Sequence, residues 1–477
     1  MPKSKTFIGI LWASLQRFGT MIVAFISNII LARLLTPKDF GTVGMLLFFI
    51  SISQVFIDSG FGAALIQKKN TTVHDYSTIF ILNIVISIIL YSLLFIASPW
   101  IAAFYDTPIL TLMLRIEGLV LIGNAFCVIQ TALLRKQMNF KKLAIANLIG
   151  NVVGSIIAII SAYSGAGVWS LIIRVLCVSY LTSACLWKIS DWRPIKYFSV
   201  KIVKELFSFG GYMLLSTGLN TIASNLQTLI IGKLFHQRTL GLYTQAMNLR
   251  NVTADSLQNV IGQVLFPDFA SLDSDKEIIK KLNNSFYIIS YFTTACLTFL
   301  FIIGKPLIIF LYSEKWSAAV LYFQILCIGG IFYAIQDINY YVIAAKGKSK
   351  LLSYINMIKI PVYVVTLYLC GTYYGIEGLL WCIVGYTVVS YLIFAMVATS
   401  LLGTNIASQF VALFKSICFS LIASLGLGLI QKTNISTLPI YEILISLLVY
   451  LIIFILSSII FKAYPLQYLN KLIRRNE

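Results

Sequence analysis

The chain alternates long apolar runs with short polar stretches along its whole length. A run of about 20 apolar residues is long enough to cross a lipid bilayer as a helix. About fourteen runs reach that length, although several carry single polar residues. They cover residues 7–31, 40–62, 77–98, 109–134, 143–163, 165–187, 207–231, 240–266, 283–303, 318–345, 351–371, 376–399, 409–430 and 439–461. The pattern predicts an all-α integral membrane protein with about fourteen transmembrane helices.

A basic turn that follows the first apolar run returns later in the chain. Residues 30–45 read ILARLLTPKDFGTVGM, and residues 230–243 read IIGKLFHQRTLGLY. Pro37 cannot continue a helix, and Gly41 lets the chain turn and begin the next one. Gly241 holds the equivalent position in the second copy, and the two copies keep a constant register. We therefore expect an internal repeat.

The amino-acid composition is that of a membrane protein, but the chain also carries a large net positive charge that needs an explanation. Hydrophobic residues make up 59% of the chain and charged residues 11%, against about 25% charged residues in a soluble domain. The formal net charge is +19, which would also suit a nucleic-acid partner. The Lys and Arg residues instead gather in alternate loops, such as 135–142, 188–204 and 346–350. By the positive-inside rule these loops and both chain ends are cytoplasmic, and no nucleic acid is expected.

This orientation defines the expected domains. The first and seventh apolar runs both start at the cytoplasmic face, so the two six-helix units are parallel repeats, a known plan of transporters. The lobes are expected at residues 1–188 and 205–399. An amphipathic cytoplasmic linker, 189–204, joins them, and its basic residues suit the surface of the inner leaflet. Residues 400–477 hold two further transmembrane helices and a basic tail.

The residues that usually bind metals or nucleotides lack the required patterns. All the cysteines lie inside apolar runs, where they read as small hydrophobic residues, and His74 and His236 lack the spacing of metal ligands. Residues 347–349 read GKS, but the position of the earlier glycine of a phosphate-binding loop is taken by Val342. We therefore expect no metal and no other cofactor.

Polar residues inside spanning helices are costly, which makes them the functional candidates. Arg17 lies about ten residues into the first run, or about 15 Å at 1.5 Å per residue, which is near mid-membrane. Other cations inside the runs include Arg115, Arg174, Arg250 and Lys359, and the acids include Asp58, Glu117, Asp255 and Asp337. Arg115 and Glu117 are two residues apart on one helix, so they point to different sides and should not pair with each other.

Polar side chains also recur at helical spacing on three of the runs. The stripes are Ser51, Gln54 and Asp58; Ser216, Asn220, Ser224 and Gln227; and Asn248, Asn251, Asp255 and Gln258. Such stripes cannot face lipid, so they line either a packed interface or a watery cavity. For a single Ser or Thr, a hydrogen bond between helices is the simpler explanation. For whole stripes on equivalent runs of both lobes we expect a cavity.

Motifs near the N-terminus resemble a known family. Trp12 and Arg17 in the first helix, ARLLTPKDFG at 32–41 and DSGFG at 58–62 are similar to the bacterial polysaccharide flippases of the multidrug/oligosaccharidyl-lipid/polysaccharide exporter superfamily. The resemblance implies a V-shaped, two-lobed transporter in the bacterial inner membrane. It also implies that undecaprenyl-diphosphate-linked oligosaccharide moves from the inner to the outer leaflet for surface polysaccharides such as lipopolysaccharide and exopolysaccharide. The lipid II flippases of this superfamily carry arginines in their second span, and this chain has none there, which counts against a peptidoglycan precursor.

That substrate suggests roles for the intramembrane residues. Guanidinium groups neutralise a diphosphate with paired hydrogen bonds, so we expect Arg17, Arg250 and Arg174, in that order, to hold it, with Arg115 as a further candidate. The amides suited to the sugar hydroxyls are Gln54, Asn220, Asn248 and Asn251. If protons or sodium drive transport, the coupling candidates are Glu117 first, Asp337 second, then Asp58 and Asp255. The alternative for each arginine is a buried ion pair, such as Arg17 with Asp58 or Arg250 with Asp255.

Two other functions stay open at this point. A multidrug/cation antiporter of the same superfamily should have a net acidic site, whereas the four arginines and Lys359 named above outnumber the four acids named with them. A membrane enzyme of polysaccharide assembly, such as a polymerase or ligase, usually needs a sizeable periplasmic loop, and the loops here are short. The sequence therefore favours a transporter rather than an enzyme, with lipid-linked oligosaccharide, membrane lipids and other polysaccharide-assembly proteins as partners.

Overall fold

The computed structural model of the chain describes residues 3–58, 61–68, 70–272, 274–431, 439–461, 463 and 465. Within these residues the regular secondary structure consists of α-helices and one short 3₁₀ helix. The all-α architecture predicted from the apolar runs is therefore confirmed.

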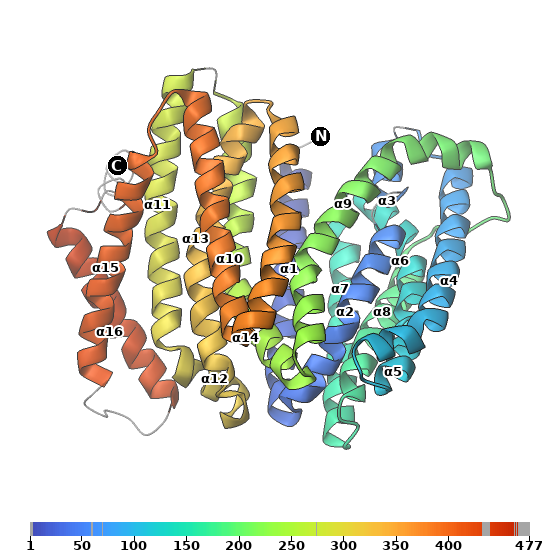
Figure 1. Ribbon diagram of the computed structural model, residues 1–477. Helices are drawn as coiled ribbons and strands as arrows, with labels where there is room; N and C mark the ends of the chain where they lie inside the picture. The colour runs from blue at the N-terminus through green and yellow to red at the C-terminus, as the bar shows by residue number, and fades with distance from the viewer. Residues whose placement is uncertain are drawn as a thin grey trace. The chain divides into compact units, whose positions relative to one another are not determined.

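The helices group into two compact units, Met1–Gly241 and Leu242–Glu477. The first holds α1 (Lys3–Leu34), α2 (Pro37–Asp58), α3 (Phe61–Gln67), α4 (Val73–Phe104), α5 (Ile109–Glu117), α6 (Leu119–Lys136), α7 (Phe140–Tyr163), α8 (Trp169–Ile189) and α9 (Val200–Leu234) (Figure 1). The second holds most of α10 (Gln237–Ala270), then α11 (Asp275–Ile302), α12 (Gly304–Tyr312), η1 (Glu314–Trp316), α13 (Ala319–Ala345), α14 (Ser349–Leu402), α15 (Ala407–Gln431) and α16 (Pro439–Ile460). The lobe boundaries at 188 and 205 stay a prediction.

Among the described residues, 11 helical segments are long and apolar enough to cross a membrane. One of them lies in α14 and contains two of the predicted runs, 351–371 and 376–399, which meet at a break at Gly375, where φ is 67°. The predicted runs 207–231 and 240–266 lie in α9 and α10, the helices that carry two of the polar stripes, and these are not among the 11. The multi-pass membrane class is thus supported, and the count of fourteen is not confirmed.

The two basic turns have the same local structure. α1 ends at Leu34 and α2 begins at Pro37, while α9 ends at Leu234 and α10 begins at Gln237. The helix boundaries therefore repeat with one offset at both ends of the turn, as an internal repeat requires. In the first copy the Thr36 amide donates to the Asp39 carboxylate at 2.8 Å, and the Asp39 amide donates back to the Thr36 hydroxyl at 3.3 Å. This reciprocal cap starts α2 immediately after the turn.

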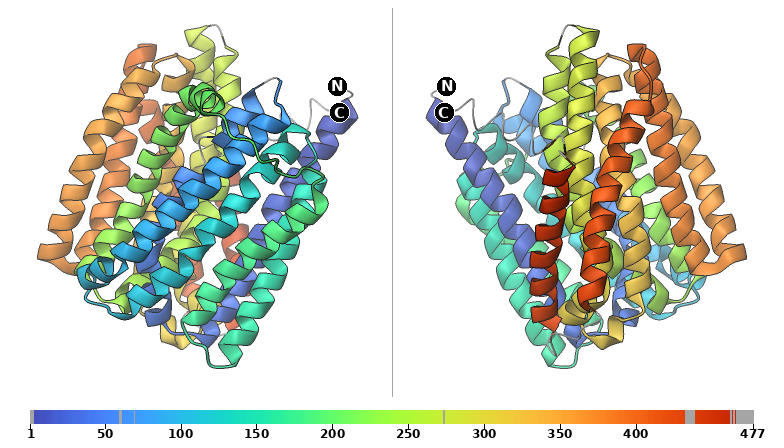
Figure 2. Two further views of the ribbon diagram at one scale, coloured as in Figure 1. Left: turned by 90° about the vertical axis from the view of Figure 1, so that its right-hand side faces the viewer. Right: turned by 90° about the vertical axis from the view of Figure 1, so that its left-hand side faces the viewer.

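Glycines bring α7 and α8 of the first unit into close contact. A Cβ placed on Gly150 would lie 3.0 Å from the backbone nitrogen of Thr182, and one on Gly154 would lie 2.9 Å from that of Val178. Small residues at such positions let spanning helices approach backbone to backbone. α7 also packs along α1, and α8 packs against α6 (Figure 2, left).

The connection between α8 and α9, residues 190–199, is non-helical and packs against α4. Trp192 is only 8% exposed, and its ring lies 6.3 Å from that of Tyr76 and 5.7 Å from that of Phe80. Lys196 in the same connection is exposed. One side of this connection is thus buried against α4 while Lys196 stays at the surface. The amphipathic cytoplasmic linker at 189–204 stays a prediction, and its last residues, from Val200 on, belong to α9.

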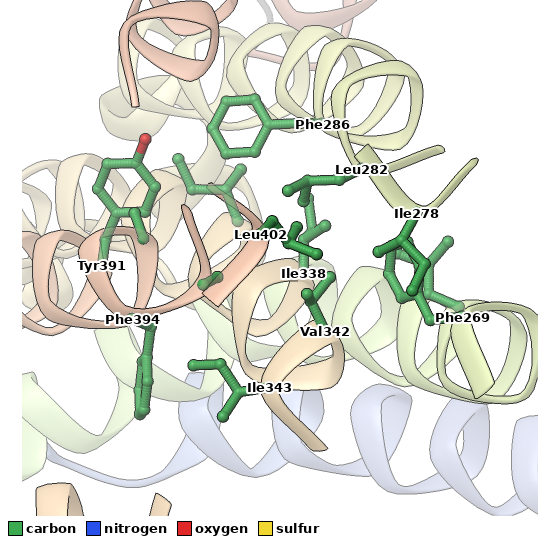
Figure 3. Packing of buried hydrophobic residues seen from close by; sticks show 14 of the residues in the cluster. Phe269, Ile278, Leu282, Phe286, Ile338, Val342, Ile343, Tyr391, Phe394 and Leu402 are labelled. Atoms are coloured by element: carbon green, nitrogen blue, oxygen red, sulfur yellow. The ribbon is translucent and has the colours of Figure 1, made fainter. Parts of the chain in front are cut away.

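The second unit is held together by an apolar core, part of which is shown in Figure 3. It joins Phe269 of α10, Phe286 of α11, Ile338 of α13 and Tyr391 of α14, all of which are buried. The rings of Phe286 and Tyr391 lie 6.0 Å apart. A second cluster on α11 anchors the C-terminal helices α15 and α16, whose position beside α11 is visible in Figure 1.

Candidate functional site

The first unit contains a polar cavity of about 580 Å³ between α2, α3, α6, α7 and α8. Its polar lining consists of amides, hydroxyls and one cation: Gln54, Asn124, Asn147, Asn151, Thr131, Ser179, Thr182 and Arg135. Aliphatic side chains, including Ile66, Val128, Val178 and Leu186, complete the walls. Among the described residues that line the cavity, none is acidic or aromatic. The cavity can therefore offer hydrogen bonds and apolar contacts to an uncharged or anionic ligand.

A hydrogen-bonded network fixes one wall of this cavity. The Asn124 amide nitrogen donates to the Gln54 side-chain oxygen at 2.8 Å, and the Ser179 hydroxyl donates to the Asn124 oxygen at 2.6 Å. The network joins α2, α6 and α8, so the orientation of each amide is set by its neighbours. Gln54, which the sequence predicted as a sugar ligand, lies in this network and lines the cavity.

The other lining residues were not among the predicted site residues, although a signal for them exists. Asn147 and Asn151 are four residues apart on α7, and Asn124, Thr131 and Arg135 recur along one face of α6. Both patterns have the spacing of a single helix face. A search for polar stripes on runs 109–134 and 143–163, as well as on the second, seventh and eighth, would have found them.

Arg115 and Glu117 lie at the end of α5, where Gly118 separates it from α6. The Arg115 Nε donates to the Ser98 hydroxyl at 3.0 Å, and the guanidinium lies 4.2 Å from the centre of the Phe95 ring. Glu117 is 1% exposed, and its Oε2 has no hydrogen-bond partner in the described part of the chain. No ion pair joins Arg115 and Glu117 there, as their spacing predicts. Glu117 is thus a deeply buried carboxyl group that its own helix leaves uncompensated.

Arg174 lies on α8, one helical turn before the cavity residue Val178. Its Nε is buried and donates to no partner among the described residues. In the second unit Arg250 is 7% exposed on α10, donates to the Asn251 side-chain oxygen at 2.8 Å and lies 4.7 Å from the centre of the Tyr333 ring. The structure therefore brings two predicted ligands, Arg250 and Asn251, together.

Lys359 is a further intramembrane cation of the second unit. Its ammonium donates to the Ser390 hydroxyl at 2.7 Å, and it lies 4.5 Å from the centre of the Phe394 ring. The Ser390 hydroxyl donates in turn to Gln336 at 2.5 Å, and Gln336 precedes the half-buried Asp337 on α13. The Lys359 ammonium is thus stabilised by a neutral hydroxyl group and an aromatic ring, and no carboxylate of the described residues is bonded to it.

The remaining predicted residues are spread over three helices. Arg17 and Asn220 are exposed on α1 and α9, and Asn248 is exposed on α10. Arg17 forms no ion pair with any carboxylate in the described part of the chain. The side chains of Asp58 and Asp255 lie outside the described residues, and so do the ion pairs considered for them.

A charged cluster outside the spans ties the ends of several helices of the first unit together. The Lys68 ammonium lies 3.1 Å from the Asp75 carboxylate and 3.0 Å from that of Glu205, which connects α3 to α4 and α9. The Lys136 ammonium donates to the carbonyl groups of Leu65 and Lys68 at the end of α3. Burial lowers the pKa of Lys68, but its hydrogen bonds to Glu205 and Asp75 outweigh burial, and the pKa is raised above its ordinary value.

Solved structures with the same fold include two transporters. The chain superposes on the lipid II flippase MurJ in an inward closed conformation with a TM-score of 0.75, covering 95% of this chain and 99% of that one at 15% identity. An inward-facing multidrug resistance MATE transporter of the MOP superfamily gives a TM-score of 0.58, covering 83% of this chain and 99% of that one at 14% identity. At these identities the likeness shows the fold alone.

Sequence relatives span most of the chain. The teichuronic acid biosynthesis protein TuaB of Bacillus subtilis is 25% identical over 422 residues, which cover 88% of this chain and 87% of that protein. The lipopolysaccharide biosynthesis protein WzxC of Escherichia coli is 23% identical over 456 residues, 91% of this chain and 90% of that protein. Residues 30–321 match the family model described as polysaccharide biosynthesis protein. This match covers more than half of the sequence, and the chain belongs to the polysaccharide biosynthesis protein family.

Proposed function

We propose that this chain is a flippase that moves lipid-linked oligosaccharide across a membrane for polysaccharide biosynthesis. The family, the full-length relatives and the transporter fold support this function. The observation that carries the proposal is the state of five cations within the predicted spans, Arg17, Arg115, Arg174, Arg250 and Lys359. None of them forms an ion pair with a carboxylate in the described part of the chain.

Such cations require compensation, and an anionic substrate supplies it. A charge at the centre of a bilayer costs at least about 2.5–3.5 kcal/mol on insertion scales. A diphosphate offers oxygens that a guanidinium binds through two parallel hydrogen bonds. We propose undecaprenyl diphosphate as the carrier lipid, with Arg17, Arg250 and Arg174 as its ligands in that order. The prenyl tail stays in the lipid while the head group passes.

The same proposal places the protein in the bacterial inner membrane with both termini in the cytoplasm. Alternate exposure of the site to the two faces then moves the head group from the inner to the outer leaflet. Glu117 is the first candidate for coupling this cycle to an ion gradient, because it is buried and its Oε2 is unbonded in the described part of the chain. Asp337, Asp58 and Asp255 follow.

A cation antiporter is the second candidate, favoured by the fold shared with a multidrug transporter and by the buried carboxyl group of Glu117. The cavity of the first unit speaks against it, because a drug cation is held by carboxylates or aromatic faces and the described lining has neither. We propose transport rather than a polymerase or ligase activity, in line with relatives such as the succinoglycan biosynthesis transport protein ExoT of Rhizobium meliloti.

A deletion strain tests the function. We expect loss of surface polysaccharide and accumulation of lipid-linked intermediates in the inner leaflet, with recovery on expression of the intact chain. Intermediates that reach the outer leaflet but are not polymerised would instead indicate an enzyme. Normal surface polysaccharide together with increased sensitivity to cationic drugs would indicate the antiporter.

A further inference from the structure

Most polar residues that line the cavity of the first unit carry an amide or a hydroxyl group. Its amides and hydroxyls come from α2, α6, α7 and α8, and each can both donate and accept hydrogen bonds. A volume of about 580 Å³ lies within the roughly 300–1,000 Å³ of pockets that bind small molecules. A polar side chain inside the bilayer is costly unless it forms a hydrogen bond with another polar group.

The amides on α7 keep their oxygens available for such a partner. The Asn147 amide nitrogen donates to the Leu143 carbonyl at 2.8 Å, and that of Asn151 donates to the Asn147 carbonyl at 2.9 Å. These bonds within the helix fix both side chains and leave their oxygens as acceptors. On α2, the Gln54 oxygen is occupied by Asn124, and the Gln54 nitrogen is left as a donor in the described part of the chain. The lining thus offers both acceptors and a donor to a ligand.

Arg135 adds a charge at one end of this neutral lining. On α6 the polar residues run from Asn124 through Thr131 to Arg135, a length of about 16 Å at 1.5 Å per residue. Arg135 is exposed in the last turn of α6, whereas Asn124 is bonded in the network of the interior. On the predicted orientation the Arg135 end faces the cytoplasm. A ligand that fills the cavity therefore meets neutral amides inside and a guanidinium at the rim.

We propose that this cavity recognises the sugar attached directly to the diphosphate of the lipid-linked substrate. The sugar hydroxyls lie among Gln54, Asn147 and Asn151, and a phosphate oxygen lies at Arg135. The ligand class is a glycosyl phosphate with an uncharged first sugar, since the described lining holds no second cation for an acidic sugar. This assignment rests on the proposed function and deepens it, because it makes the first unit the part that selects which glycan is carried.

Cys127 lines the cavity and provides a reporter in the intact protein. In a variant that keeps Cys127 and replaces the other cysteines with alanine, the rate of maleimide alkylation reports occupancy. The probe is the lipid-linked oligosaccharide extracted from the deletion strain. At ten times its Kd, about a tenth of the cavities are free, so alkylation should slow about tenfold. Undecaprenyl diphosphate without sugar should have little effect.

Two variants separate a binding role from a structural one. Asn147→Leu combined with Asn151→Leu should abolish the protection of Cys127 while the protein elutes as the intact chain does in size-exclusion chromatography. Asn225→Leu is the matched control, because the Asn225 amide makes the same bond, 2.9 Å to Thr221 within α9, and does not line the cavity. It should keep full protection.

The outcomes distinguish this inference from the proposed function. Equal protection by undecaprenyl diphosphate alone would overturn it, because the cavity would then hold the head group rather than a sugar. Absent protection, in a strain whose surface polysaccharide still depends on the chain, would overturn it while the flippase stands. If the deletion strain accumulates no lipid-linked intermediate, the proposed function itself fails, and that result does not depend on the cavity.

Discussion

Gly41 and Gly241 pack against each other backbone to backbone. A Cβ placed on either residue would lie 2.9 Å from the backbone nitrogen of the other. The contact is reciprocal in a second way, because a Cβ on Gly41 would collide with the Gln237 carbonyl and one on Gly241 with the Pro37 carbonyl. Equivalent positions of the two basic turns thus meet as the two halves of a symmetric interface do.

We expect Gly41→Ala and Gly241→Ala each to destabilise the protein by about 1–3 kcal/mol, because the added methyl group overpacks a backbone contact. The double variant should cost less than the sum of the two, since the first methyl group already separates the turns. Thermal unfolding of the purified protein in detergent measures both effects. Gly385→Ala is the control, because a Cβ there meets no atom within 4 Å. Additive losses would contradict a direct contact.

Arg17→Lys should express normally and lower transport of lipid-linked oligosaccharide at least about tenfold, the ratio that 1.4 kcal/mol of lost binding produces. An ammonium keeps the charge but lacks the planar fork that grips a diphosphate. Surface polysaccharide at low expression is the measurement, and Arg33→Lys near the end of the same helix is the control. Near-normal polysaccharide in a well-expressed Arg17→Ala strain would rule out Arg17 as an essential ligand.

Glu117→Gln should preserve expression and remove the dependence of transport on the ion gradient, because an amide cannot exchange a proton or bind sodium with a charge. Transport in vesicles with and without an imposed gradient measures this. Glu277→Gln, at an exposed position in the first turn of α11, is the control. Unchanged gradient dependence in both Glu117→Gln and Asp337→Asn would defeat the coupling proposal.

The predicted orientation can be tested at sites that the structure shows to be accessible. Lys141, Ser164 and Lys348 are all exposed. In a cysteine-free background, Lys141→Cys and Lys348→Cys should resist an impermeant thiol reagent in intact cells, and Ser164→Cys should react. Labelling of the first two from outside would reverse the topology.

Lys68→Met should lower stability by about 1–3 kcal/mol, because it leaves the Asp75 carboxylate, only 3% exposed, without its cation. Glu205→Gln should cost less, since that carboxylate is 56% exposed. The raised pKa of Lys68 means that its contribution is complete below about pH 10.5 and is lost only as pH rises further. If the difference in stability between the intact protein and Lys68→Met disappeared between pH 6 and 9, the ion pairs of Lys68 with Asp75 and Glu205 would be contradicted.

The elements were predictable from the sequence because apolar runs and turn residues act locally. Pro37 begins a helix in the structure, as its missing N–H allows, whereas Gly41, expected at the turn, lies inside the first turns of α2. The cavity was only partly predictable, since Gln54 belonged to a visible stripe but Asn124 and Ser179 lie 55 residues apart on different helices. A lone amide in a spanning helix can line a cavity or form a hydrogen bond between helices. The sequence fits both roles equally well, and only the packing of the helices distinguishes them.

Trp192 shows a different limit. The basic residues around it predicted a segment at the membrane surface, and the sequence carries no mark that its ring is buried between the aromatic residues of α4. That burial depends on how close the end of α8 lies to α4 in the folded protein, and the local sequence does not determine this distance. The burial of Glu117 at the junction of α5 and α6 depends in the same way on helices that are distant in sequence.

The contact between Gly41 and Gly241 also sets an order of events during biogenesis. The ribosome reaches the second turn about 10–40 s after the first, at roughly 5–20 residues per second. During that interval α1 to α8 enter the membrane while the backbone at Gly41 waits for its partner. The first half of the nascent chain therefore exposes an unmatched backbone surface to the insertion machinery, and only synthesis of the first turns of α10 closes it.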